Sequence, residues 1–246
     1  MEHMPSNDPA SESRRGPSGW LAVWKMAMTR PSEQTFMELT DRPEAVSKTA
    51  FIWVFIAGTV SGIMQALLQT IYAATGTTPQ FPIPGLEQYM PDGGDAGSMG
   101  ISLVIGLCLT PVVGLLSVIF FAIGTAIVQW IAKLFGGLGT FDKLAYALAA
   151  ITVPFTLVSS VLALFTAIPY VSSCIGILSI GLSLYILVLQ VMAVKGVNRF
   201  GWGAALGSVF IPGLVVFIFC CCLIVLGSAL LGPAIGEAFN NFQFAP

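Results

Sequence analysis

Titratable side chains that could carry out acid–base chemistry are few in this 246-residue chain, and its only histidine is His3. One charged cluster could act as such a site, and its members are Lys133, Asp142, Lys143, Lys195 and Arg199. Basic residues at the borders of apolar segments also anchor a membrane protein with those borders in the cytoplasm, and this interpretation competes with catalysis. General acid–base catalysis needs titratable groups at the reacting centre. We therefore predict that the protein is not an enzyme and has no catalytic residue.

Cysteine and aspartate patterns do not indicate a metal site. Cys220, Cys221 and Cys222 are consecutive, so on a helix they point ~100° apart and cannot converge on one ion. All five cysteines lie in apolar runs, which is typical of small buried side chains rather than disulfides. The segment 92–95 lacks the other oxygen ligands of a calcium loop and indicates a turn. We expect no metal, no cofactor and no nucleic-acid partner.

The composition points to a membrane protein. Hydrophobic residues make up 56% of the chain and charged residues only 9%, whereas soluble proteins carry roughly 25% charged residues. No charge occurs in the runs 49–86, 96–132, 144–194 and 200–236. A membrane-spanning helix needs ~20 apolar residues, so the third run can hold two spans. We predict an all-α polytopic bundle of five transmembrane helices, at about 48–73, 99–130, 144–166, 171–194 and 202–231.

The chain before the first predicted span divides into two parts. Residues 1–18 have the composition of a disordered cytoplasmic tail, without a cleavable signal peptide, so the first span would act as a signal anchor. Residues 19–47 predict one or two interfacial amphipathic helices. Trp20 and Trp24, beside Lys25, are expected to anchor the first in the headgroup region. Ser32 is the expected N-cap of the second. The predicted membrane domain covers 48–232, and 233–246 would form a short outer tail.

The distribution of charge predicts the orientation. With the N-terminus inside, all ten Lys and Arg residues fall in inner segments. The outer segments then hold only the acidic residues Glu87, Asp92, Asp95 and Glu237. Cytoplasmic loops of membrane proteins carry the excess of basic residues. We therefore expect a multi-pass membrane protein with a cytoplasmic N-terminus and an outer C-terminus.

Small residues recur at four-residue spacing within the predicted spans. Gly58 with Gly62, and Gly203 with Gly207, would let helix backbones approach closely. The contact could form within one chain or between two copies. Prolines at 111, 154 and 212 each remove a helical hydrogen bond and predict kinks.

Polar residues inside the predicted spans are uncharged. Ion-coupled transporters usually carry an intramembrane ionisable residue, so their absence argues against proton relay and charged cargo. Uncharged candidates for a pore or for hydrogen bonds between helices are Gln65, Gln69, Gln129 and Gln190. A pathway for a neutral solute stays open.

One inner loop carries a recognisable pattern. Phe135-Gly136-Gly137-Leu138-Gly139-Thr140-Phe141 is followed by Ala145-Tyr146-Ala147 and Pro154, and Thr29-Arg30-Pro31 with Phe36 precede the first span. Over about 20–232 the chain resembles the Yip domain family of Ypt- and Rab-interacting membrane proteins, in its prokaryotic branch. The resemblance implies a five-helix bundle, a prokaryotic cell membrane and a non-enzymatic role. In eukaryotic relatives that role is vesicle trafficking through small GTPases and partner membrane proteins. Their long acidic cytosolic segment is not recognisable here, so small-GTPase binding rests on analogy.

Two functions remain in competition. The first is a membrane-organising or trafficking-type scaffold that acts through helix–helix and partner contacts. The second is a transporter or channel for a neutral or lipid-like solute. Besides the bilayer, expected partners are other membrane proteins or a second copy. The candidate functional residues of the inner loop are Phe135, Gly136, Gly137, Gly139, Thr140, Phe141 and Tyr146.

Overall fold

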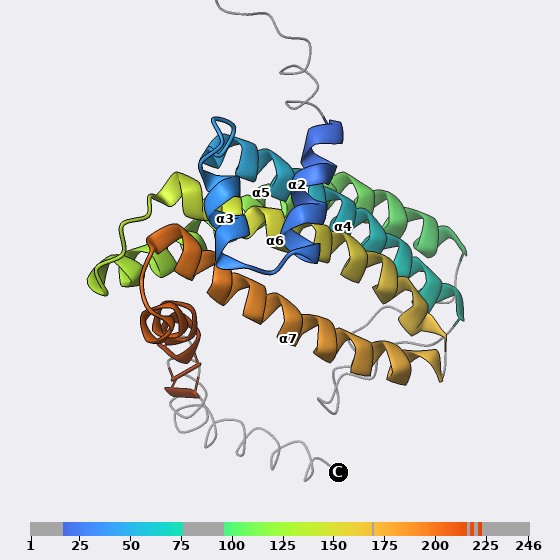
Figure 1. The fold of residues 1–246 in the computed structure, drawn as a ribbon. Coiled ribbons are helices and arrows are strands. Elements are labelled where there is room, and N and C mark those ends of the chain that lie inside the picture. The colour runs from blue at the N-terminus through green and yellow to red at the C-terminus, as the bar shows by residue number, and fades with distance from the viewer. Residues whose placement is uncertain (1–16, 76–95, 169, 216, 219–220, 223–246) are drawn as a thin grey trace, which may run out of the picture.

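The described part of the chain is helical and contains no strand. The computed structural model describes residues 17–75, 96–168, 170–215, 217–218 and 221–222. Its elements are α2 (Pro17–Thr29), α3 (Glu33–Thr40), α4 (Ser47–Thr75), α5 (Ala96–Leu134), α6 (Phe141–Leu164), the 3₁₀ turn η2 (Phe165–Ala167) and α7 (Val171–Asn198) (Figure 1). An apolar helix, Trp202–Val215, follows them. The predicted all-α class is therefore confirmed.

Four helices in the described ranges are long and apolar enough to cross a membrane. They are Ser47–Tyr72, Leu103–Leu134, Phe141–Ala167 and Val171–Asn198. The described part of the last apolar helix, Trp202–Val215, is shorter than a span, and most of the rest of the predicted fifth span lies outside the described residues. The chain is thus a multi-span membrane protein, and the count of five stays a prediction. Residues 1–16 of the predicted N-terminal tail, the predicted outer tail, and residues 76–95 with the acidic residues Glu87, Asp92 and Asp95 also lie outside the described ranges, whereas residues 17 and 18 belong to α2.

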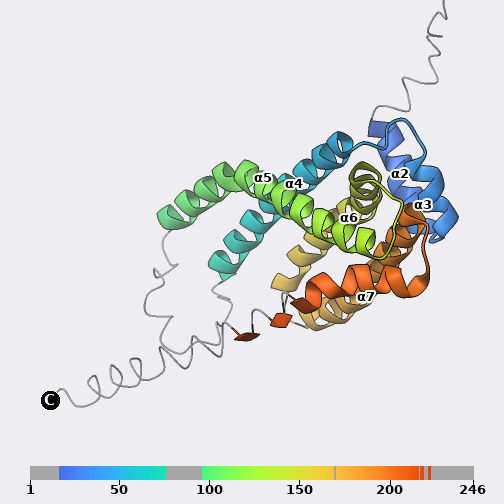
Figure 2. The same ribbon diagram turned by 90° about the vertical axis from the view of Figure 1, so that its left-hand side faces the viewer.

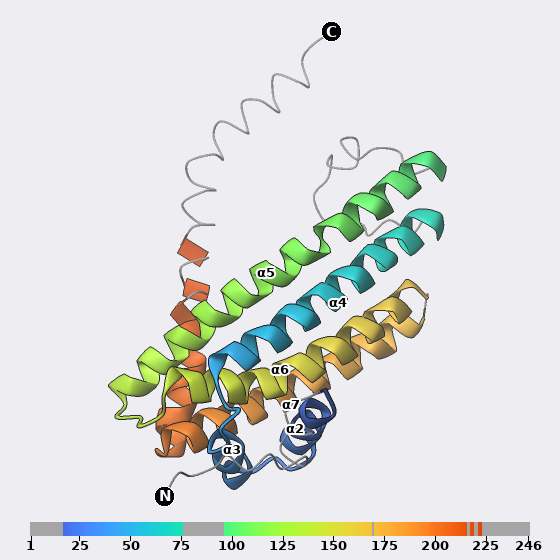
Figure 3. The same cartoon turned by 90° about the horizontal axis from the view of Figure 1, so that it is seen from above.

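The long helices pack in a fixed order. Helix α5 packs on α4, α4 packs on α6, and α6 packs on α7, as Figures 2 and 3 show from two directions. Four helix ends lie on the same side of the bundle, which we call the inner end. They are the first residues of α4 and α6, Ser47 and Phe141, and the last residues of α5 and α7, Leu134 and Asn198. Here the first part of α6 is surrounded, because all eight residues from Leu144 to Ile151 are buried.

Small residues form the contact between α4 and α5. A β-carbon added at Gly58 would lie 2.8 Å from the Ser117 β-carbon, and one at Gly62 would lie 3.4 Å from that of Thr110. The contact therefore forms within one chain, which is one of the two alternatives for this pair. Gly203 has no atom within 4 Å of an added β-carbon, and Gly207 lies beside the ring of Phe135. The second glycine pair thus makes no comparable backbone approach.

The helices α5 and α6 continue through their prolines. Pro111 lies inside α5 and Pro154 inside α6. Helix α5 has 39 residues, about 58 Å at 1.5 Å per residue, and exceeds a hydrocarbon core of ~30 Å. Most large apolar side chains along α5 are exposed. We interpret this face as a surface in contact with lipid.

The two N-terminal helices lie against the bundle. Helix α3 packs on α7 and α6, and α2 packs on α6 (Figure 3). Helix α3 begins as predicted, because the Thr35 backbone N–H donates to Ser32 Oγ at 3.1 Å. Trp20 and Trp24 meet the buried ring of Trp53 in α4, with centroids 6.0 and 5.7 Å away. These tryptophans therefore join α2 to the bundle, and their interfacial position stays a prediction.

Candidate functional site

The inner loop 135–140 begins with a glycine-dependent helix end. The Gly137 N–H donates to the Ala132 carbonyl at 2.9 Å, and the Gly136 N–H donates to the Lys133 carbonyl at 3.0 Å. This pair of bonds is a Schellman motif, which needs a left-handed residue after the helix. Gly136 takes that conformation, with φ of +83°. Because side chains disfavour positive φ, glycine suits this position.

The loop then closes onto the end of α7 through hydrogen bonds. Gln129 Nε2 donates to the Gly139 carbonyl at 2.7 Å and to Asn198 Oδ1 at 3.2 Å. The Leu138 N–H donates to the Asn198 carbonyl at 3.1 Å. Gln129 is 6% exposed and Asn198 is fully buried. The two amides therefore join α5, the loop and α7 where water is excluded.

Two loop glycines make this closure possible. A β-carbon at Gly137 would lie 2.6 Å from Asn198 Oδ1 and 2.8 Å from the Ala132 carbonyl oxygen. One at Gly139 would lie 2.8 Å from the same Oδ1 and 2.9 Å from the Val197 carbonyl oxygen. Such distances are too short for real β-carbons. Only glycine therefore fits at positions 137 and 139, where the loop packs against Asn198.

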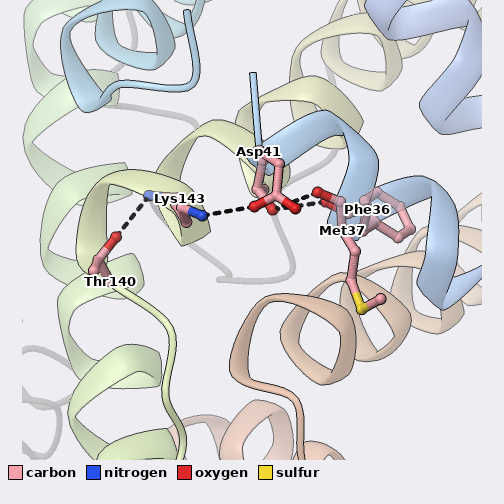
Figure 4. Close-up of polar contacts among 6 residues, drawn as sticks. Phe36, Met37, Asp41, Thr140 and Lys143 are labelled. Atoms are coloured by element: carbon pink, nitrogen blue, oxygen red, sulfur yellow. Dashed lines mark hydrogen bonds and ion pairs between the residues drawn. The ribbon is translucent and has the colours of Figure 1, made fainter. Parts of the chain in front are cut away.

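The first turn of α6 contacts both α4 and α3. Thr140 is its N-cap, because its Oγ1 accepts from the Lys143 N–H at 3.4 Å. Asp142 Oδ1 accepts from the Ser47 N–H at the start of α4, at 3.3 Å. Lys143 Nζ forms an ion pair with Asp41, the C-cap of α3, at 2.8 Å (Figure 4). This turn therefore connects α4, α6 and α3.

A second set of contacts holds α3 on α7. Lys195 forms an ion pair with Glu33 and lies over the ring of Trp202, 4.5 Å from its centroid. Beside this pair, a β-carbon at Gly196 would lie 2.8 Å from the Glu33 carbonyl oxygen and 3.3 Å from the Phe36 β-carbon. Helix α3 is thus held by an ion pair and by a close backbone approach on the same face of α7.

Lowering the pH should weaken the Asp41–Lys143 contact. The hydrogen bond from Lys143, followed by its charge, holds the pKa of the Asp41 carboxyl below its ordinary value of 3.8. The stabilising effect is therefore present above pH 3.8 and is lost as the pH falls through the lowered pKa. We expect hydrogen exchange in α3, corrected for intrinsic rates, to increase as the pH falls below 3.8.

The variant Asp41→Asn is the control for this prediction. It lacks the titrating carboxylate, so the corrected exchange rate of α3 should show a smaller pH dependence than in the wild type. The two groups are largely exposed, and exposed ion pairs contribute little, so we expect a small effect. Identical pH profiles for the two proteins would show that the pair does not hold α3.

The structure separates the predicted loop residues into three groups. Gly137 and Gly139 face Asn198, and Gly136 and Thr140 shape the loop without burial. Phe135 is half exposed, and its ring lies beside Gly207. The remaining two residues belong to α6 and pack on α4, Phe141 against Phe51 and Tyr146 against Trp53. The seven predicted residues therefore do not form one surface, and their functional role stays a prediction.

Asn198 is the central residue that sequence reasoning missed. The predicted fourth span ended at 194, but α7 continues to Asn198 and includes Lys195. A single amide in the short segment between Lys195 and Arg199 resembles an ordinary loop residue, so no local signal marks it. Gln129 was predicted either to line a pore or to donate between helices, and the structure shows it donating to Asn198.

The helices and the closed inner end define the class, an all-helical multi-span membrane protein. The family model described as Yip1 domain matches residues 25–227. The chain belongs to the Yip1 domain family, a non-enzymatic family of membrane proteins. No curated protein and no solved structure gives a significant match.

Proposed function

We propose that the protein is a non-enzymatic membrane scaffold that presents a preformed surface at its inner end. We call this surface the inner platform; it consists of α2, α3 and the loop 135–140. The observation that supports it is that α3 is held on the bundle by the partly buried ion pair Glu33–Lys195 and by the close approach to Gly196, with the exposed pair Asp41–Lys143 as a weaker contact. A surface held in this way needs little ordering when it binds a partner.

The chemistry of the platform favours a protein partner with acidic and apolar groups. Leu138, at the tip of the loop, is 74% exposed, and Leu21 of α2 is also exposed. Five exposed basic residues lie in or near these elements in the chain and form no ion pair with another described residue, against one exposed acidic residue of α3, Glu38; they are Lys25, Arg30, Arg42, Lys133 and Arg199. Apolar anchors within a charged rim are typical of protein interfaces.

The inner platform would lie on one side of the membrane and bind partners there. The platform would face the cytoplasm, because the charge pattern predicts that side for the inner end. A prokaryotic cell membrane is implied by the family resemblance alone. Partners would be other membrane proteins or a second copy of this chain. Small-GTPase binding is supported only by analogy with eukaryotic members of the family.

Displacing α3 should abolish partner capture without removing the bundle. In Gly196→Val, the new side chain would collide with the Glu33 carbonyl. With a photo-crosslinking residue in place of Leu138, we expect crosslinked partner bands in native membranes and at least a severalfold loss of them in Gly196→Val. The matched control is Gly203→Val, where an added β-carbon meets nothing within 4 Å. Unchanged crosslinking in Gly196→Val, or no crosslinks in the wild type, would contradict the proposal.

A specific observation favours transport as the second candidate function. Thr152, Thr156 and Ser160 follow one another at four-residue spacing on α6 and line hollows beside α4. Such a row of hydroxyls could contact a neutral or lipid-like solute. Liposomes containing the protein should then show flux or lipid scrambling, and their absence would exclude this candidate.

A further inference from the structure

A groove between α4 and α6 is lined by hydroxyl and amide groups as well as by apolar side chains. It consists of two hollows of about 250 and 190 Å³ that share Thr156. We call them the outer and the lower hollow. Ser61, on the outer hollow, is about 20 Å along α4 from the inner end, at 1.5 Å per residue. The outer hollow therefore lies in the half of the span far from the inner platform.

Each hydroxyl that lines the lower hollow already donates a hydrogen bond to a backbone carbonyl. Ser117 Oγ donates to the Val113 carbonyl at 2.8 Å, and Thr152 Oγ1 donates to the Leu148 carbonyl at 2.9 Å. Thr156 Oγ1 donates to the Thr152 carbonyl at 2.8 Å. Its other lining residues are apolar: Val54, Ala57, Gly58, Phe121 and Val153. This hollow therefore suits an apolar chain.

The outer hollow differs because it holds unpaired polar groups. Ser61, Gln65 and Ser159 line it, and none of them forms a hydrogen bond with any described residue. The hydrocarbon core offers no water, so each unsatisfied polar group there costs free energy. A ligand that exchanges hydrogen bonds with these three side chains would remove that cost.

The lining also selects against charge. No Asp, Glu, Lys, Arg or His is among the lining residues of either hollow. A charged head would have no counter-ion in this part of the groove, and its burial would be costly. Together the hollows fall within the roughly 300–1,000 Å³ of small-molecule sites. The groove thus fits one slender, uncharged molecule with a polar and an apolar end.

We propose that this groove binds an uncharged, single-chain amphiphile through a hydroxyl or amide head. The head meets Ser61, Gln65 and Ser159, and the chain extends towards the inner end, between Ala57 and Val153. This is the direction in which lipids of the leaflet far from the inner platform point their chains. The site does not depend on the scaffold function. It deepens the transport candidate by naming its class of solute, but binding requires no transport.

Photolabelling in nanodiscs tests the site with a defined probe. The probe is a monoacylglycerol with a diazirine in its chain, and labelled peptides are located by mass spectrometry. We expect labelling of α4 and α6 along the groove, competed by unlabelled monoolein and not by the charged oleate. In Gln65→Leu combined with Ser159→Ala, losing the hydrogen bonds should weaken apparent binding about tenfold.

The control is Gln69→Leu, the same change one turn further along α4 at an exposed residue outside the groove lining. It should label like the wild type. Equal labelling of the double variant and the control, or equal competition by oleate, would overturn the site and leave a nonspecific apolar crevice. Labelling without liposome flux would keep the site and exclude transport. No labelling of the wild-type protein along the groove, with platform crosslinks present, would reject the site and leave the scaffold function standing.

Discussion

Valine in place of Gly137 should destabilise the protein by about 3 kcal/mol, because overpacking and broken buried hydrogen bonds cost 1–3 kcal/mol each. The added β-carbon would lie 2.6 Å from Asn198 Oδ1 and 2.8 Å from the Ala132 carbonyl, to which Gly137 itself donates. Neither neighbour can give way easily. The carbonyl is part of the helix end of α5, and the buried amide of Asn198 is held by Gln129 and by the Val194 carbonyl.

The unfolding transition measured in detergent tests this prediction. We expect the apparent midpoint of Gly137→Val to fall well below that of the wild type, or the protein to lose its monodisperse form. Gly201→Val is the matched control, since Gly201 is also a loop glycine and an added β-carbon there meets nothing within 4 Å. If the two variants unfold alike, the close approach of the loop to Asn198 is not stabilising.

Local and compositional features of the fold were predictable because each has a signal within a short stretch of sequence. Lengths of charge-free runs located the described spans, since burial in lipid excludes charge over ~20 residues. Ser32 was predicted as an N-cap because its hydroxyl bonds to a residue three positions away. The glycines of the loop form a recognisable sequence motif, although the motif does not predict the backbone conformation or close contacts of each glycine.

Contacts between distant residues were not predictable from one sequence. The predicted end of the fourth span at 194 relied on Lys195 being a loop residue. Instead Lys195 stays in α7, because Glu33 of α3 neutralises it at the inner end. Trp24 likewise suits a headgroup layer by composition, but Trp53 provides a ring for it in α4. Each partner is separated in sequence by many residues, so only the packed structure reveals the pair.

The hydrogen bond between the buried amides of Gln129 and Asn198 holds the loop 135–140 in place while the tip of the loop stays exposed. Gln129 belongs to α5, Gly139 to the loop and Asn198 to α7, so one bonded group fixes three elements. Leu138 lies between two fixed points, and its side chain remains exposed. A partner that meets this leucine would therefore contact a loop with little freedom left to lose.

Asn198→Asp should destabilise the protein by about 3–5 kcal/mol, the cost of an uncompensated buried charge. Asn198 is fully buried; its Nδ2 donates to the Val194 carbonyl at 3.1 Å, and its Oδ1 accepts from Gln129. A carboxylate keeps the shape but turns the donor into a second acceptor, which would then face the Val194 carbonyl. The nearby cations Lys195 and Arg199 point elsewhere, since Lys195 pairs with Glu33 and Arg199 is exposed.

A double-mutant cycle shows how much of the stability at this site comes from the hydrogen bond between Gln129 and Asn198 rather than from the burial of each side chain. Gln129→Leu leaves the buried Asn198 Oδ1 without its donor, and Asn198→Leu leaves Gln129 Nε2 with the Gly139 carbonyl alone. The double variant removes both side-chain amides. We expect the double variant to lose less than the sum of the two single losses, with a coupling of about 1–2 kcal/mol. Additive losses would show that the two amides act independently. In that case Gln129 would act only through the Gly139 carbonyl, and the joint between the loop and α7 would depend on the Leu138 bond and on glycine packing.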